Sequence, residues 1–210
     1  MTTPHLANGR YHLNGTSYPR VSDILATLAK PGLDAWKRRV GFTEADRVSR
    51  EATALGTRIH VLCEGLMKRH TLIASPAETV YLKAFEGWFY DNVRAVVAVE
   101  WTVVHERHGY AGTLDLLADM NDGRRLVVDL KTGKSVDATY RLQLTAYKDA
   151  LEEAGEHVDG RLVVHLPSNR PGELHPIEFD GDEHDRKAWV ALLRLYKWQQ
   201  RHKDAWKASR

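Results

Sequence analysis

Two β-prone segments joined by a tight turn constrain the fold of this chain more than any other feature. Residues 110–120 and 124–131 are rich in apolar and β-branched residues, and an Asn-Asp-Gly turn at 121–123 separates them. Such a turn between two strand-like segments is typical of an antiparallel hairpin. A further β-branched segment, 96–104, precedes the pair. The sequence therefore predicts a sheet that is antiparallel in its first part.

Side chains alternate between the two faces of a β-strand, so the segment 124–131 sorts its residues into two sets. The Leu and Val residues at even positions share one apolar face, whereas Asp129 and Lys131 point together from the other. An isolated Asp-x-Lys pair is most often a modest surface ion pair. Its interpretation therefore depends on the residues that accompany it.

The two preceding segments also place an acid on a face that is otherwise apolar or neutral. Asp115 lies in the middle of 110–120, and Glu100 lies in 96–104. Burying an unpaired carboxylate is unfavourable, so several carboxylates that pairing strands bring together require protons or a cation. A hard divalent ion with oxygen ligands meets that requirement. We therefore expect Asp115 and Asp129 to belong to a metal site with Lys131 beside it.

The order of elements predicts a single domain of the α/β class, a sheet with helices on both sides. We expect a mainly helical part over 1–94, a part over 95–181 that holds the sheet and one further helix, and a basic helix over 182–210. The predicted elements are a hairpin at 10–19, helices at 23–30 (with Ser22 as N-cap), 33–40, 43–69, 77–93, 138–154 and 182–207, and strands at 96–104, 110–120, 124–131, 161–166 and 173–179.

Composition narrows the setting in which such a chain works. Cys63 is the one cysteine, so no intramolecular disulfide can form. No apolar run approaches the roughly 20 residues that cross a bilayer, and the N-terminus lacks the apolar core of a signal peptide. We therefore expect a cytoplasmic protein without a membrane partner.

Positive charge gathers in two segments, although the net charge of the chain is only +2. Residues 181–210 hold eight Lys or Arg against four Asp or Glu, and residues 30–58 hold seven against four. Such local surpluses suit contact with a phosphate backbone. A solvated helix face is an equally good interpretation of each segment taken alone.

Two further motifs flank the acidic strands. Gly-Thr-Arg-Ile-His at 56–60 precedes them, and Gln143-x-x-x-Tyr147 follows them. In this order the motifs resemble the PD-(D/E)xK nuclease superfamily, in particular its RecB-like exonuclease branch. Leu114 stands where the superfamily name has proline, a position that varies among its members. The segment 18–36 also resembles phage-type members of this group.

The resemblance implies a restriction-endonuclease-like fold, a central mixed β-sheet flanked by helices, and a specific ligand set. His60, Asp115, Asp129 and the main-chain carbonyl of Leu130 would hold Mg²⁺ or Mn²⁺, and an imidazole ligand suits Mn²⁺. Glu100 is a candidate for a second metal or for supporting the first. Some relatives carry an iron–sulfur cluster on four cysteines, which this chain with its one cysteine cannot do.

The resemblance also assigns roles in catalysis and DNA binding. Lys131 would orient the attacking water or stabilise developing negative charge. Gln143 and Tyr147, four residues apart on one helix face, would position Lys131 and a DNA phosphate; a partly buried amide and a core tyrosine are the alternative. The weaker candidates for contacts with DNA are Lys134, Arg141, Arg58 and Trp36.

The function implied is a metal-dependent DNA exonuclease acting at single- or double-stranded ends, in recombination, repair or DNA turnover, in a bacterial or phage-infected cell. A structure-specific endonuclease of the same superfamily and a non-catalytic DNA-binding module are the alternatives. No Walker A motif occurs, so ATP-driven unwinding would need a helicase or recombination partner. Oligomeric state is left open.

Overall fold

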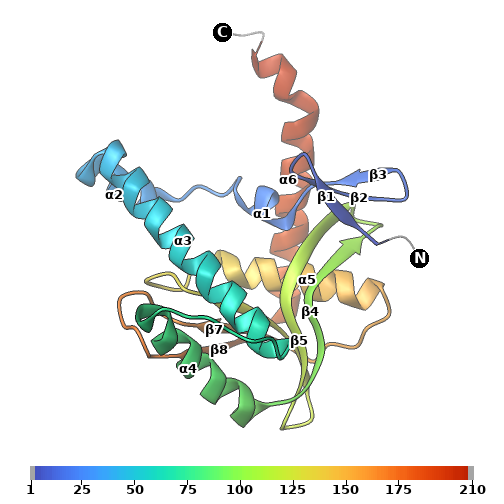
Figure 1. The fold of residues 1–210 in the computed structure, drawn as a ribbon. Coiled ribbons are helices and arrows are strands. Elements are labelled where there is room, and N and C mark those ends of the chain that lie inside the picture. The colour runs from blue at the N-terminus through green and yellow to red at the C-terminus, as the bar shows by residue number, and fades with distance from the viewer. Residues whose placement is uncertain (1–2, 208–210) are drawn as a thin grey trace.

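The protein was analysed as a computed structural model, which describes residues 3–207, with side chains described up to residue 203. A five-stranded sheet lies at its centre (Figure 1). The strands neighbour one another in chain order, and all pairs are antiparallel except the parallel pair β6–β7. The strands are β4 (Val93–His105), β5 (Tyr110–Met120), β6 (Arg125–Lys131), β7 (Gly160–His165) and β8 (His175–Phe179). The predicted strands and the mixed sheet are thus confirmed.

The single parallel pair follows from the connection between its strands. Helix α5 (Thr139–Glu153) links β6 to β7, and a crossover of this length lets the second strand run in the direction of the first. The β5–β6 link is instead the short turn around Gly123, whose φ of 90° is left-handed. The same sheet therefore contains both a hairpin and a βαβ unit, which makes it mixed.

A small antiparallel sheet precedes the helices. The predicted hairpin is confirmed, because Asn14 (φ 49°) and Gly15 (φ 78°) form its turn in left-handed conformations. A third strand that the sequence did not reveal pairs with its first strand. The three strands are β1 (His5–Ala7), β2 (Arg10–Leu13) and β3 (Thr16–Tyr18).

The first helix differs from its prediction. The helix expected at 23–30 with Ser22 as N-cap is instead a single turn, α1 (Val21–Leu25), with Arg20 as N-cap and no capping side chain. The Thr27 hydroxyl donates to the Ile24 carbonyl at 2.7 Å, which turns the chain back on the end of the helix. The next helix then begins at Pro31, a favoured first position. The first of the two predicted helices is therefore shorter than expected, and the second begins two residues before its predicted start.

The remaining helices lie close to their predicted bounds. Gly41 (φ 88°) separates α2 from α3, and a capping box formed by Ser75 and Glu78 starts α4. They are α2 (Pro31–Val40), α3 (Phe42–Met67), α4 (Pro76–Asn92) and α6 (Asp182–Lys207). Among the described residues, no helix is long and apolar enough to cross a membrane.

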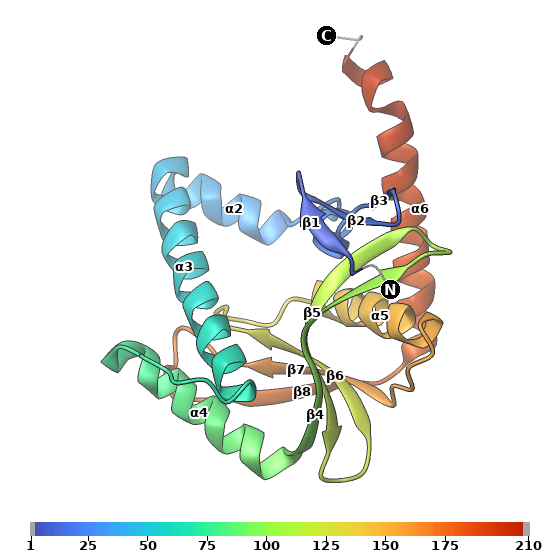
Figure 2. The same cartoon turned by 45° about the vertical axis from the view of Figure 1, so that its right-hand side comes forward.

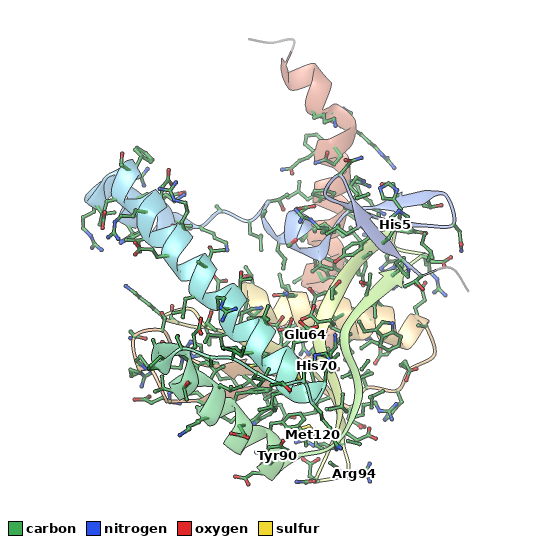
Figure 3. The ribbon with its side chains drawn as sticks, viewed as in Figure 1. His5, Glu64, His70, Tyr90, Arg94 and Met120 are labelled. Carbon is green, nitrogen blue, oxygen red and sulfur yellow. The ribbon has the colours of Figure 1, made fainter. Side chains whose placement is uncertain are left out.

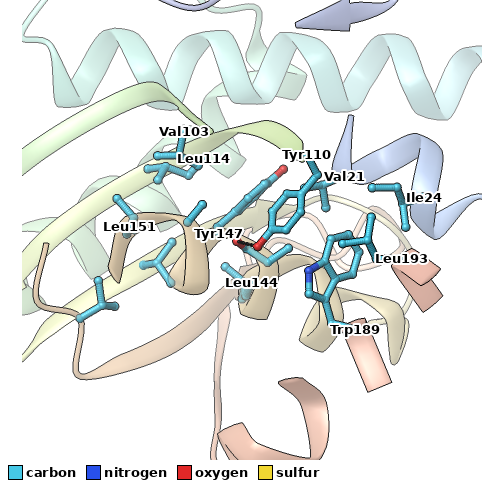
Figure 4. Close-up of a cluster of buried hydrophobic side chains, with 14 of the residues drawn as sticks. Val21, Ile24, Val103, Tyr110, Leu114, Leu144, Tyr147, Leu151, Trp189 and Leu193 are labelled. Atoms are coloured by element: carbon cyan, nitrogen blue, oxygen red, sulfur yellow. Dashed lines mark hydrogen bonds between the residues drawn. The ribbon is translucent and has the colours of Figure 1, made fainter. Parts of the chain in front are cut away.

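Helices cover both faces of the sheet (Figure 2). On one face, α3 and α4 bury Ile59 and Phe85 against Val128 and its neighbours. On the other face, α5 and α6 pack Leu144 and Trp189 against the sheet (Figure 4). The indole of Trp189 is fully buried, so this residue belongs to the core. The division of the chain at residues 94 and 181 stays a prediction.

Candidate active site

The sheet opens at the position of its central acids. The pairing of β5 with β6 runs from Asp119↔Arg125 to Leu116↔Val128 and ends there. One step further the register would place Asp115 opposite Asp129. Instead, the Asp115 carboxylate accepts a hydrogen bond from the Leu130 amide at 2.6 Å. A side chain thus replaces a strand-to-strand bond, and the two strands part where their carboxylates lie.

A third acid belongs to the same row. The register of β4 with β5, Val99↔Leu116 and Trp101↔Leu114, places Glu100 across from Asp115. Glu100 also has a φ of 52°, a left-handed conformation that is uncommon for a residue other than glycine and strained within a strand. Strain of this kind gathers at functional sites.

Electrostatics sets Glu100 apart from the other exposed acids. Although the residue as a whole is exposed, partial burial of its carboxyl and the neighbouring charges of Asp115 and Glu64 raise its pKa to about 7. Glu64, one turn beyond His60 on α3, lies beside the long strands β4 and β5 (Figure 3) and forms an ion pair with Lys68 at 2.6 Å. Acids on a neighbouring strand and on a helix thus both act on the charge of the Glu100 carboxyl.

Helix α3 brings the histidine to this row because a glycine lets it lie close to the sheet. A Cβ atom at Gly56 would lie only 2.8 Å from Thr132 Oγ1, just after β6, so a larger residue would require the threonine side chain or the helix to shift. One turn later, His60 Nδ1 lies 3.6 Å from Asp115 Oδ2. The structure therefore brings together the histidine motif and the first acid.

Asp129 and Lys131 form a buried pair. Asp129 is 2% exposed, and its Oδ2 atom pairs with the Lys131 ammonium without the geometry of a hydrogen bond. Burial raises the pKa of Asp129 to about 6; Lys131 opposes that rise and Asp115 adds to it. Burial alone would lower the pKa of Lys131, but the two carboxylates outweigh it, so its pKa is raised. The lysine therefore stays charged at neutral pH.

Helix α5 places the glutamine and tyrosine next to this pair. Gln143 Nε2 donates to the Tyr147 hydroxyl at 3.0 Å, and Tyr147 is buried. A Cβ atom at position 112 would lie 2.5 Å from the Tyr147 ring, so Gly112 makes room for it. Burial, with the nearby charge of Asp129, raises the pKa of Tyr147. The phenol therefore stays neutral at ordinary pH.

The sequence interpretation missed Tyr140. The Lys131 ammonium lies 4.7 Å from the centroid of its ring, a cation–π contact. Tyr140 is three residues before Gln143, so the two share a helix face. That spacing was the available signal, but only the structure shows that the shared face turns toward Lys131.

Two of the proposed DNA contacts are engaged elsewhere. Arg58 forms an ion pair with Glu78 on α4, with an N–O distance of 3.0 Å. Arg141 forms an ion pair with Asp185 on α6, at 3.1 Å, and packs over the Phe179 ring. A phosphate would have to displace a carboxylate from either guanidinium, so neither is a free phosphate contact in this structure.

The other two candidates are accessible. Lys134 is exposed and makes no ion pair with any described residue. Trp36 is half-buried on α2, a helix in which no residue is fully buried. Contact of these residues with DNA stays a prediction.

The donor set suits a hard divalent cation. Carboxylates outnumber cations in the row, and the buried Asp129 Oδ2 lacks a hydrogen bond. Across the residues whose side chains are described, no group of three or more His, Cys, Asp or Glu is already arranged around one point to hold an ion. His60, Asp115 and Asp129 would therefore need the Leu130 carbonyl or water to complete a coordination shell, and Mg²⁺ commonly keeps several waters.

Comparison with known proteins defines the class. The chain matches the family described as the PD-(D/E)XK nuclease superfamily over residues 35–208, and it belongs to that superfamily. Its mixed sheet with flanking helices is accordingly of the restriction-endonuclease-like type. Among curated proteins, no significant match was found.

Solved structures show only distant likeness. The crystal structure of SSO0001 is 16% identical, with a TM-score of 0.45, over 87% of this chain and 76% of that one. The structure of a "putative exonuclease" from Eubacterium rectale is 9% identical, with a TM-score of 0.39, over 58% of this chain and 53% of that one. Likeness at this level carries no inference about activity.

Proposed function

We propose that this nuclease-superfamily protein is a metal-dependent exonuclease that hydrolyses phosphodiester bonds at DNA ends. The observation that carries the proposal is the convergence of His60, Asp115, Asp129 and Lys131 from three separate elements at the point where β5 and β6 part. A surface ion pair would need neither the open strands nor the buried acids.

The metal ligands we propose are His60, Asp115, Asp129 and the Leu130 carbonyl, with Glu100 for a second ion. Mg²⁺ or Mn²⁺ held there would polarise the scissile phosphate and lower the pKa of a bound water. The row of acids would hold the cation. The cation would offset the negative charge that Lys131 leaves unbalanced. The ligand roles are tested by the substitution of Asp129 described below.

The protein's own groups would orient the attack. Lys131 stays protonated, so it would act as a hydrogen-bond donor to the attacking water or to the developing oxyanion, not as a base. The ring of Tyr140 limits the directions open to its ammonium. Gln143 and Tyr147 would fix this side of the site and donate to a phosphate oxygen.

We further propose that the chain is of the RecB-like, phage type and acts in recombination, repair or DNA turnover in the cytoplasm of a bacterial or phage-infected cell. The motifs at 56–60 and 143–147 support this branch. A helicase or recombination protein would supply unwinding when duplex DNA is the substrate, because the chain has no Walker A motif of its own.

The test is cleavage of end-labelled linear single- and double-stranded DNA beside a covalently closed circle. It would be run with Mg²⁺, Mn²⁺ or EDTA, on the wild type and Asp129→Ala. Metal-dependent loss of the linear DNA alone, absent in the variant, is the expected result, and the label pattern gives the polarity. Cleavage of the circle would replace the exonuclease proposal with an endonuclease. Binding without cleavage of any substrate would favour the non-catalytic module.

A further inference from the structure

A pocket of about 550 Å³ opens beside the candidate active site. One wall comes from α1 and the residues that follow it, and the other comes from the first turns of α5. Its volume falls in the range of sites that hold small organic groups. The lining residues used below are Ser22, Leu25, Leu28, Lys30, Tyr140 and Gln143.

Two residues belong to both the pocket and the active site. Tyr140 lines the pocket, and its ring lies 4.7 Å from the Lys131 ammonium. Gln143 lines the pocket and donates to Tyr147. The pocket is therefore separated by one side chain from the lysine that we place at the scissile phosphate. A group held there would be the immediate neighbour of that phosphate.

The chemistry of the lining is apolar inside and polar at the edge. Leu25, Leu28 and Tyr140 are partly buried side chains packed against the main core, so they form a fixed apolar wall. Ser22, Lys30 and the acid Asp34 are exposed at the rim. A flat ring with a polar edge, attached to an anionic phosphate, matches this arrangement. An aromatic side chain beside a cation is also the usual surface on which a base stacks.

We propose that this pocket receives the nucleobase next to the scissile phosphate, with Tyr140 as the stacking surface and Lys30 facing the backbone at the rim. This inference rests on the proposed nuclease function and narrows its substrate. A base inside a duplex cannot enter a pocket while paired, so the strand must be unpaired at the cleavage point. The substrate class is therefore a single strand or a frayed end, without strong preference for one base, because every base presents a face for stacking.

The first arm of the test leaves the protein unchanged. Single-stranded oligonucleotides, each with one abasic position moved stepwise along the strand, are tested with wild-type protein for binding by fluorescence anisotropy and for cleavage with Mg²⁺ or Mn²⁺. Loss of one stacked base corresponds to about a tenfold weaker interaction. We expect that loss at one register relative to the cut, and at no other. A scan without position dependence overturns the inference.

The second arm fills the pocket. Ala29 lines it and is exposed, so Ala29→Trp adds bulk there; Ala188→Trp on the exposed side of α6 is the matched control. Ala29→Trp should raise KM about tenfold with kcat little changed, and should no longer respond to the abasic position. An equal change of KM in both variants, or no change in either, contradicts the proposal that the pocket binds a base.

The two proposals fail differently in this experiment. Position-dependent binding without any cleavage removes the nuclease proposal and leaves the base pocket standing. Metal-dependent cleavage that does not depend on the abasic position removes the base pocket and leaves the nuclease proposal standing. Circular dichroism of both tryptophan variants confirms that the fold is intact before the kinetic comparison.

Discussion

The protein carries two clusters of charged side chains that are balanced in opposite ways. In the first, Arg161 is fully buried and lies 2.8 Å from Asp182 and 2.9 Å from Asp185. Lys148 adds a second cation to Asp182. Cations and anions are matched, and main-chain carbonyls, such as that of Asp180, accept the remaining guanidinium protons.

The second cluster is the candidate active site, where the charges do not balance. Glu100, Asp115 and Asp129 face Lys131 and a histidine that is charged only when protonated. Burial raises the pKa values of Glu100 and Asp129, and the charge of Asp115 raises both further, which means that the charges repel. The difference teaches how to separate two kinds of buried charge. A cluster that its own side chains neutralise serves the fold, whereas a cluster with surplus negative charge requires a cation from outside.

The largest predicted effect is on catalysis at the unbalanced cluster. Lys131→Ala should lower kcat about 10³- to 10⁴-fold, because the positioned ammonium is removed from the reacting phosphate. DNA binding, measured by anisotropy, should stay largely intact. Lys83→Ala, on the exposed side of α4, is the control and should keep its kcat. Unchanged turnover in Lys131→Ala would remove the proposed site.

The balanced cluster should show its effect in stability instead. Arg161→Ala leaves Asp182 and Asp185 without their buried partner, and loss of one partner from such a cluster reduces the free energy of unfolding by about 3–5 kcal/mol. Chemical denaturation measures it. Lys187→Ala, which removes an exposed ion pair with Glu183, should have almost no effect. Equal stability of the two variants would show that the cluster is not structural.

A substitution at the unbalanced cluster should act on stability with the opposite sign. The pKa of Asp129 is raised to about 6, so its ionised form is disfavoured in the folded protein, and this penalty is present above that pH. Asp129→Asn should therefore raise the free energy of unfolding by about 1 kcal/mol at pH 7.5 in EDTA. Mg²⁺ or Mn²⁺ should stabilise the wild type but not the variant. Destabilisation in EDTA would contradict the surplus of charge; Asp91→Asn, on an exposed site, is the control.

The smallest effect should come from acid. Burial would raise the pKa of Asp182, but the hydrogen bond from Lys148 and the charge of Arg161 outweigh it and lower the pKa. The stabilisation is therefore complete above the ordinary carboxyl pKa of about 4 and is lost as pH falls through the lower folded-state value. The melting temperature should fall less from pH 5 to pH 3 in Asp182→Asn than in the wild type. The same slope in both would exclude this pair as a source of acid sensitivity.

Local sequence patterns predicted much of this fold. They failed at the end of one short helix and where distant parts of the chain pack together. Alternation in β6 correctly placed Asp129 and Lys131 on one face, because strand geometry is local. The end of α1 depends on the hydrogen bond from the Thr27 hydroxyl to the Ile24 carbonyl, and β1 depends on pairing with β2. The sequence pattern predicted neither feature. The ion pair of Arg141 with Asp185, which joins α5 to α6, is likewise a contact that no local pattern predicts.

The site shows the same division. The proximity of His60 to Asp115 could be inferred only by resemblance, since 55 positions of chain separate them and no periodicity links the two. The left-handed backbone of Glu100 had no signature in the sequence, and the spacing of Tyr140 from Gln143 did not reveal its contact with Lys131. Both depend on how a helix or a neighbouring strand packs.

The bond from the Leu130 amide to the Asp115 carboxylate has a consequence for how this activity can be lost. The acid holds apart the two strands whose separation exposes the site, so chemistry and shape depend on the same two oxygens. A descendant that replaced Asp115 with an apolar residue would lose a ligand and would free an amide to seek a main-chain partner. The ladder between β5 and β6 could then close by a further step. Inactive relatives should accordingly show a longer pairing of β5 with β6 as well as a missing acid.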